Sequence, residues 1–147
     1  MSQARISFYV LSGSEQRTRL GYACRLMEKA WKLQHRIHAH ADDGNMARAL
    51  DDLLWTFRQG SFVPHEILAA NGQPLAPITI GAAEIAAGDP PPADLLVNLA
   101  TEVPPFFDRF PRIVEIIDGT AAGRTAGRAR HRFYRDQGLE PETHEVS

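Results

Sequence analysis

The chain has 147 residues, of which 44% are hydrophobic and 23% charged, and its formal net charge is −2 at pH 7. These values are ordinary for one globular domain with a sizeable core, and they exclude a uniformly basic nucleic-acid binder. The single cysteine, Cys24, excludes an internal disulfide and a cysteine-ligated zinc site. We find no apolar run of membrane-spanning length and no signal segment, so we expect a soluble cytoplasmic protein with no membrane partner.

The first half of the chain alternates short apolar runs with amphipathic stretches. Residues 5–11 are rich in β-branched and aromatic side chains, which predicts a buried strand. Residues 15–33 carry apolar side chains three and four positions apart, which predicts a long helix. Residues 37–41 predict a second strand and residues 46–57 a second helix. This order predicts parallel strands joined by right-handed crossovers.

The second half of the chain is less regular. Residues 69–93 contain many Pro, Gly and Asn and predict a loose segment, within which 78–80 is a candidate short strand. Whether that strand joins the sheet stays open. The apolar runs at 94–99 and 112–118 predict two further strands.

The end of the chain completes the expected architecture. Pro104 and Pro105 predict a short helix that continues through Phe110, because proline is tolerated in a first helical turn. Residues 120–136 predict an arginine-rich helix. We therefore expect one three-layer α/β domain over residues 1–138, a mainly parallel sheet flanked by helices, followed by a polar tail over 139–147.

The sequence contains no motif typical of a catalytic or nucleotide site. In such a fold a phosphate loop belongs in the first strand-to-helix turn, but residues 11–17 contain one glycine and match neither common phosphate-binding motif. We expect a helix cap there and no cofactor. The adjacent Asp51 and Asp52 would point about 100° apart on a helix, and no nucleophile-elbow sequence occurs. The sequence therefore predicts a protein that is not an enzyme.

Two histidines form the nearest approach to a metal site. His38 and His40 are two positions apart on a predicted strand, so their side chains share a face. With Asp42 or Asp43 they could hold a metal, but so small a ligand set specifies one only weakly. We favour partly exposed histidines at a strand end and expect no metal.

Residues 50–65, LDDLLWTFRQGSFVPH, concentrate aromatic and apolar side chains. Four of them predict a core-facing helical stripe: Leu50, Leu53, Leu54 and Phe57. Trp55 falls beside that stripe, and Pro64 disfavours helical geometry at Val63. Aromatic residues on a turn are typical of interface centres. The pattern alone does not decide whether the aromatic residues of this stretch belong to the protein core or to an interface with a partner.

The predicted last helix has no acidic residue between positions 119 and 135. Arg124, Arg128 and Arg132 are four positions apart and stack on one face, with His131 beside them. Like charges at this spacing are mildly destabilising, which favours an anionic partner such as phosphates or an acidic peptide. A solvated helix face is the alternative.

Three parts of the sequence together carry a family resemblance: Phe8-Tyr9-Val10-Leu11; Leu50-Asp51-x-x-Leu54-Trp55 with Ser61-Phe62-Val63-Pro64-His65; and Arg124-x3-Arg128-x-Arg130-His131-Arg132-x-Tyr134-Arg135. The tryptophan and the Phe-Val-Pro-His sequence are fairly specific. The other parts are weak individually, but they occur in the expected order over nearly the whole chain. In this combination the chain resembles the chi subunit family of bacterial DNA polymerase III.

The resemblance implies a non-catalytic accessory subunit of the clamp-loader assembly, with a Rossmann-like fold that binds no nucleotide. It implies two partners, the psi subunit and the acidic C-terminal tail of single-stranded-DNA-binding protein, so that DNA is contacted only indirectly. We expect a monomer in the absence of partners.

Carried over by motif, the psi-binding residues would be Trp55, Phe62, Val63, Pro64 and His65. The tail-binding residues would be Ile117, Arg124, Arg128, His131, Arg132 and Tyr134. The family pattern commonly has an aromatic residue at the position of His131, so the apolar side of the tail pocket is either weaker here or supplied by Tyr134. The alternative function is a nucleic-acid-binding module that uses the same arginines on phosphates.

Overall fold

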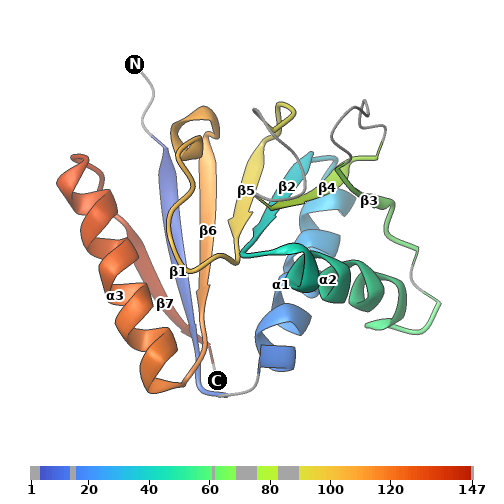
Figure 1. Cartoon of the computed structure of the whole chain (residues 1–147). Helices are drawn as coiled ribbons and strands as arrows, with labels where there is room; N and C mark the ends of the chain where they lie inside the picture. Colours follow the sequence, from blue (N-terminus) through green and yellow to red (C-terminus); the bar gives the residue numbers. More distant parts are fainter. Residues whose placement is uncertain (1–3, 14–15, 61, 69–75, 83–89, 147) are drawn as a thin grey trace.

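A seven-stranded sheet organises the molecule (Figure 1), and every strand pair in the described part of the chain is parallel. The structure is a computed structural model that describes residues 4–13, 16–60, 62–68, 76–82 and 90–146. The strands are β1 (Arg5–Leu11), β2 (Ile37–Ala41), β3 (His65–Ile67), β4 (Ile78–Ala82), β5 (Leu95–Asn98), β6 (Arg112–Ile117) and β7 (Glu142–Val146). Their order across the sheet is β3-β4-β2-β5-β6-β1-β7.

Helices cover both faces of this sheet. The helices α1 (Gln16–Lys32) and α2 (Gly44–Thr56) pack on one face, while α3 (Ala121–Asp136) and the short 3-10 helix η1 (Phe107–Arg109) pack on the other. The predicted three-layer α/β architecture is therefore confirmed. None of the described helices is long and apolar enough to cross a bilayer.

The alternation of side chains along β2 shows how the two faces are assigned. Ile37, Ala39 and Ala41 belong to the core under α1 and α2. His38 and His40 point the other way, because successive strand side chains alternate between faces. Both faces of the central strands are buried, as is usual for parallel strands joined by helical crossovers.

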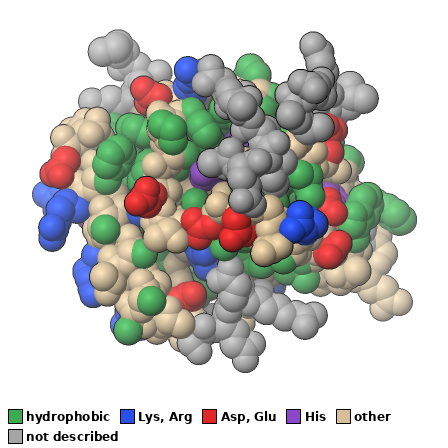
Figure 2. Space-filling model, viewed as in Figure 1, with side chains coloured by type: hydrophobic (Ala, Val, Ile, Leu, Met, Phe, Trp, Pro, Cys, Tyr) green, Lys and Arg blue, Asp and Glu red, His purple; other side chains and the backbone are tan. Residues whose placement is uncertain are grey.

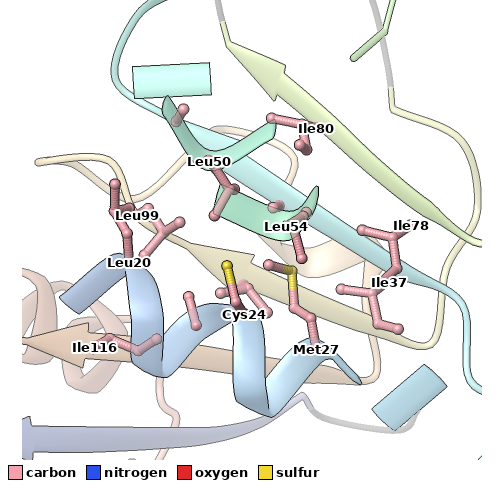
Figure 3. Close-up of a cluster of buried hydrophobic side chains, with 14 of the residues drawn as sticks. Leu20, Cys24, Met27, Ile37, Leu50, Leu54, Ile78, Ile80, Leu99 and Ile116 are labelled. Carbon is pink, nitrogen blue, oxygen red and sulfur yellow. The ribbon is translucent and has the colours of Figure 1, made fainter. Parts of the chain in front are cut away.

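Figure 3 shows the larger core, where α1 and α2 meet above the sheet. Leu20, Cys24 and Met27 of α1 face Leu50 and Leu54 of α2. All five are buried, with relative exposures of 5% or less. Burial raises the pKa of the Cys24 thiol to about 12, so this cysteine is a neutral core residue at physiological pH.

The segment 78–80 is part of the sheet. It forms β4, which pairs with β2 on one side and β3 on the other, and all five residues of β4 are buried. Predicted features at residues 14–15, 69–75 and 83–89 lie outside the described residues.

Two predictions for the second half of the chain were wrong in detail. The helix expected after Pro104 and Pro105 is a single 3-10 turn, η1, and Phe110 is already extended. The polar tail expected over 139–147 contains the strand β7, which pairs with β1 from Glu142 to Val146. Its side chains are polar because no helix covers this edge strand, while its backbone still forms the sheet's hydrogen bonds.

Candidate partner-binding surfaces

The helix α2 and the turn after it position one group of exposed aromatic residues. Asp43 caps the helix, since its carboxylate accepts the backbone N–H of Met46 at 2.8 Å. The helix closes where the Phe57 N–H donates to the Leu53 carbonyl at 2.7 Å. Gly60 has a φ of +78°, which glycine adopts without the steric cost of a side chain, and the chain then returns toward β3.

Residues 62–65 alternate between solvent and core. Phe62 is 79% exposed and Pro64 is exposed, whereas Val63 is fully buried and His65 is 8% exposed. The prediction that Val63 and His65 present themselves to a partner was therefore wrong. Only His65 of these four residues belongs to the strand β3, and their burial shows that every second side chain from Phe62 to His65 faces outward.

The buried His65 supports the exposed Trp55. The two ring centroids are 4.4 Å apart, and Trp55 remains 51% exposed. His65 Nδ1 lies 2.6 Å from the Val63 carbonyl oxygen, and its Nε2 lies 3.1 Å from an Asp51 carboxylate oxygen. His65 is thus a positioning residue, and we call the outward-facing set Trp55, Phe62 and Pro64 the hook surface.

The opposite edge of the sheet carries α3. Thr120 caps this helix, because its hydroxyl oxygen accepts the Gly123 N–H at 2.9 Å. Gly127 faces β6, and a Cβ at this position would lie 2.3 Å from Ile117 Cδ1. Helix propensity counts Gly127 as a weakening residue, but its small size is what permits the close approach of α3 to the sheet.

Beneath α3 lies a buried network centred on Glu115 of β6. One carboxylate oxygen accepts from Arg130 Nε at 2.7 Å, and the other accepts from the Tyr134 hydroxyl at 2.6 Å and from Asn98 Nδ2 at 2.9 Å. Burial, and next the Glu115 charge, raise the pKa of Tyr134 above its ordinary value, so the phenol stays protonated. Tyr134 is fully buried, and the prediction that it lines a tail pocket was wrong.

The sequence pattern did not identify this network. Arg130 looked like one more cation on an acid-free helix, yet it is 4% exposed and paired with Glu115. The signal that could have revealed the pair is Glu115 itself, an acid inside an otherwise apolar strand, since a buried carboxylate requires a partner.

The remaining arginines of α3 form what we call the arginine face: Arg124, Arg128, Arg132 and Arg135. All four are exposed, and within the described ranges none of them makes a salt bridge. Figure 2 shows basic side chains gathered on the outer side of α3. Because these charges are unpaired, the helix presents a concentrated positive surface.

Apolar groups lie next to the arginine face. His131 is half-buried, and its ring centroid is 5.2 Å from that of Phe8. Ile117 is 8% exposed and lies against α3 at Gly127, one helical turn before His131. Ile117 thus lies under the sheet-facing side of α3, His131 lies between that side and solvent, and the predicted arginines are on the exposed side. That these residues form one tail-binding site stays a prediction.

The histidine pair of β2 lies inside the molecule. His38 is 1% exposed, so the expectation of a partly exposed residue was wrong for it, while His40 is half-buried. His38 Nδ1 lies 2.7 Å from the Thr79 hydroxyl oxygen, and its ring stacks on Phe110. In the part of the chain that the structure describes, no three His, Cys, Asp or Glu residues are grouped to hold a metal.

Comparison with known proteins identifies the family. The family model described as "DNA polymerase III chi subunit, HolC" matches residues 3–142. DNA polymerase III subunit chi of Pseudomonas aeruginosa is 37% identical over 144 residues, which cover 97% of this chain and 96% of that protein. The subunit chi of Haemophilus influenzae is 28% identical over 139 residues, or 95% of each chain.

Solved structures support the fold alone. The structure of S. cerevisiae Dbp5 L327V bound to RNA and ADP BeF3 superposes with a TM-score of 0.68 at 12% identity over 99% of this chain, which spans 42% of the Dbp5 chain. A second structure of that protein, bound to Gle1 H337R and IP6, gives a TM-score of 0.63. The resemblance to this Rossmann-like domain confirms the predicted fold class.

The family match extends over nearly the whole chain, and its relatives agree in both name and length. The chain belongs to the family of DNA polymerase III chi subunits, non-catalytic accessory subunits of the replicative polymerase.

Proposed function

We propose that this protein connects the clamp-loader assembly to single-stranded-DNA-binding protein in the bacterial cytoplasm. It would bind the psi subunit through the hook surface and the acidic C-terminal tail of single-stranded-DNA-binding protein through the arginine face. The observation that carries the proposal is the row of unpaired arginines on α3, on the other face of the sheet from α2 and its exposed Trp55.

Charge and shape support tail binding at the arginine face. An arginine guanidinium can donate two parallel hydrogen bonds to a carboxylate, and Arg124, Arg128 and Arg132 offer three such groups along one helix face. The half-buried His131 lies beside these arginines and offers a neighbour for a hydrophobic terminal side chain, while Ile117 is buried and adds little exposed surface.

The hook surface suits a stable protein partner. Phe62 and Trp55 are among the large hydrophobic residues that the described chain leaves exposed. Large aromatic side chains on a rigid support are typical of interface hot spots, and His65 holds the Trp55 ring in place.

The alternative is that the arginine face binds nucleic-acid phosphates. Two observations disfavour it. The chain carries a net charge of −2, and the exposed Glu145 of β7 lies beside Val10, on the face of the sheet that α3 covers. This carboxylate would repel an extended phosphate backbone but leave room for a short peptide.

Peptide titration tests tail binding. We expect a short acidic peptide that ends in a phenylalanine with a free carboxylate to bind at micromolar affinity by fluorescence anisotropy. Arg128→Ala should weaken binding by about 1.5–3 kcal/mol, the range for charge-assisted hydrogen bonds. Arg48→Ala, which removes an exposed arginine on α2, is the matched control and should leave the affinity unchanged.

The terminal residue distinguishes the two functions. Removal of the terminal phenylalanine should abolish peptide binding. If the shortened peptide bound equally well and single-stranded DNA bound more tightly, the arginine face would be a phosphate-binding surface and the tail proposal would be wrong.

A further inference from the structure

A third surface lies on the face of the sheet opposite α3. It is a groove of about 440 Å³ between α1 and the strands β1, β5 and β6. None of its lining residues belongs to the hook surface or to the arginine face. The groove is therefore separate from both surfaces of the proposed function.

The floor of this groove is apolar. Leu95 and Val114 from the sheet and Leu26 and Ala30 from α1 line it. Leu33, just after α1, is 63% exposed at its rim. An exposed leucine beside a continuous apolar floor gives the groove a surface that a partner's apolar side chains can cover.

The rim of the groove is basic. Arg25, Lys29 and Arg112 are exposed lining residues, and the half-buried His35 lines the groove beside them. No lining residue is acidic. Within the described residues, no salt bridge involves Arg25, Lys29 or Arg112. The strand register adds a further cation, because Arg5 of β1 lies directly beside Arg112 of β6.

The aromatic rings of the groove are already engaged. Tyr9 stacks on His144, with centroids 5.2 Å apart and planes at 24°. Tyr22 packs against Tyr9 at 5.7 Å and carries the Arg25 guanidinium at 5.8 Å from its ring centre. Single-stranded nucleic acid binds by stacking bases on open aromatic faces, which these rings do not offer.

We propose that this groove binds an acidic, amphipathic segment of a partner protein. Apolar side chains of the segment would cover the exposed Leu33 and the half-buried Leu26, since Leu95 and Val114 are only 3% and 1% exposed. Its carboxylates would pair with Arg25, Lys29 and Arg112. The unpaired positive rim around an apolar floor is complementary to that combination of groups. This inference does not rest on the proposed function, since the arginine face lies on the other side of the sheet.

Anisotropy titration with a defined probe tests this. The probe is a short fluorescein-labelled peptide of alternating leucine and glutamate, with a C-terminal amide so that it lacks a terminal carboxylate. The full-length protein should bind it, and Lys29→Glu combined with Arg112→Glu should weaken binding about tenfold or more. Lys32→Glu, an exposed change on the same helix but outside the groove, should shift the affinity less than about twofold.

Two further variants distinguish binding in the groove from binding elsewhere on the protein. Leu33→Ser removes apolar surface without disturbing a buried residue and should weaken the probe several-fold, with an unchanged melting temperature. Arg128→Ala should not affect the probe, even though it weakens tail binding at the arginine face.

Three results would overturn the inference. The first is no binding of the probe by the unmodified protein. The second is equal weakening by the groove variants and by Lys32→Glu, which would indicate nonspecific attraction. The third is tighter binding of an oligothymidylate that is lost in the same groove variants, which would make the groove a nucleic-acid site.

Discussion

Glu115 illustrates how a single buried residue decides which charged side chains of α3 remain exposed for binding a partner. It lies in the middle of β6, is fully buried, and accepts hydrogen bonds from Arg130, Tyr134 and Asn98. This network buries Tyr134, a predicted tail-binding residue, and Arg130, a further cation of the arginine-rich helix. Spacing along a helix identifies which residues share a face, but it cannot show which face the sheet will cover.

The buried His38 predicts a dependence of stability on pH. Burial, and next the charge of His40, lower the pKa of His38 to about 3, well below the ordinary value for histidine. Between these two values the unfolded chain binds a proton that the native protein does not. The free energy of unfolding should therefore fall as the pH is lowered from about 6.5 toward 3, by up to about 1.4 kcal/mol per pH unit from this residue.

Urea denaturation at a series of pH values, with and without the substitution His38→Gln, measures this contribution. Glutamine does not titrate and can keep a hydrogen bond to Thr79. The variant should show a shallower loss of stability between about pH 6.5 and pH 4. Equal slopes for the two proteins would mean that His38 titrates normally in the native state.

At the scale of elements, the segment after α2 shows how much of a candidate site a sequence can reveal. The Phe-Val-Pro-His sequence marks the position of a surface, and the helical stripe identifies Leu50 and Leu54 as core. The pattern does not reveal which of residues 62–65 face the core, because this depends on how the chain enters β3, whose pairing with β4 begins at His65. Of the four residues predicted to contact the partner, Phe62 and Pro64 face outward, whereas Val63 and His65 face inward.

Paired alanine substitutions check that division. Val63→Ala should lower the free energy of unfolding by about 1.5–3 kcal/mol, because a fully buried valine is truncated. Phe62→Ala should change stability by less than about 0.5 kcal/mol, because the side chain is 79% exposed. Thermal denaturation of both variants measures the difference, and a pull-down with psi measures the role of Phe62 in binding. A large loss of melting temperature in Phe62→Ala would place that ring in the core.

The strand β7 was missed for a related reason. Sequence patterns identify strands by their apolar side chains, but four of the five residues of β7 are exposed and polar. What holds this segment is backbone pairing with β1, together with Val146 against the core and His144 on Tyr9. An edge strand with two exposed faces has almost no hydrophobic pattern to detect.

For the whole molecule, the sheet sets the distance between the two proposed partners. The hook surface lies beside the edge strand β3, whereas α3 packs over β6 on the other face of the sheet from α2. β3 and β6 are four intervals of about 4.8 Å apart, or about 19 Å. A psi subunit beside β3 and a short tail peptide on the outer side of α3 should therefore not touch.

Independent binding is the expected result. The tail peptide should bind the chain with the same affinity, within about twofold, whether or not psi is present, and a ternary complex should elute as one species in size-exclusion chromatography. Isothermal titration with and without psi measures this. Mutual exclusion of the two ligands would show that their surfaces overlap and would contradict a bridging role.

The pairing of β1 with β6 and β7 also constrains how the protein can be made. In the described sheet β1 lies between β6 and β7, which both come much later in the chain. Until residues 112–117 are synthesised, β1 lacks both of these neighbours, and its apolar residues Ile6 and Phe8 have no α3 to cover them. Long-range parallel pairing of this kind forms slowly and leaves strand edges open in the meantime. A chain that stops before residue 112 would therefore retain an open apolar strand capable of pairing with other proteins.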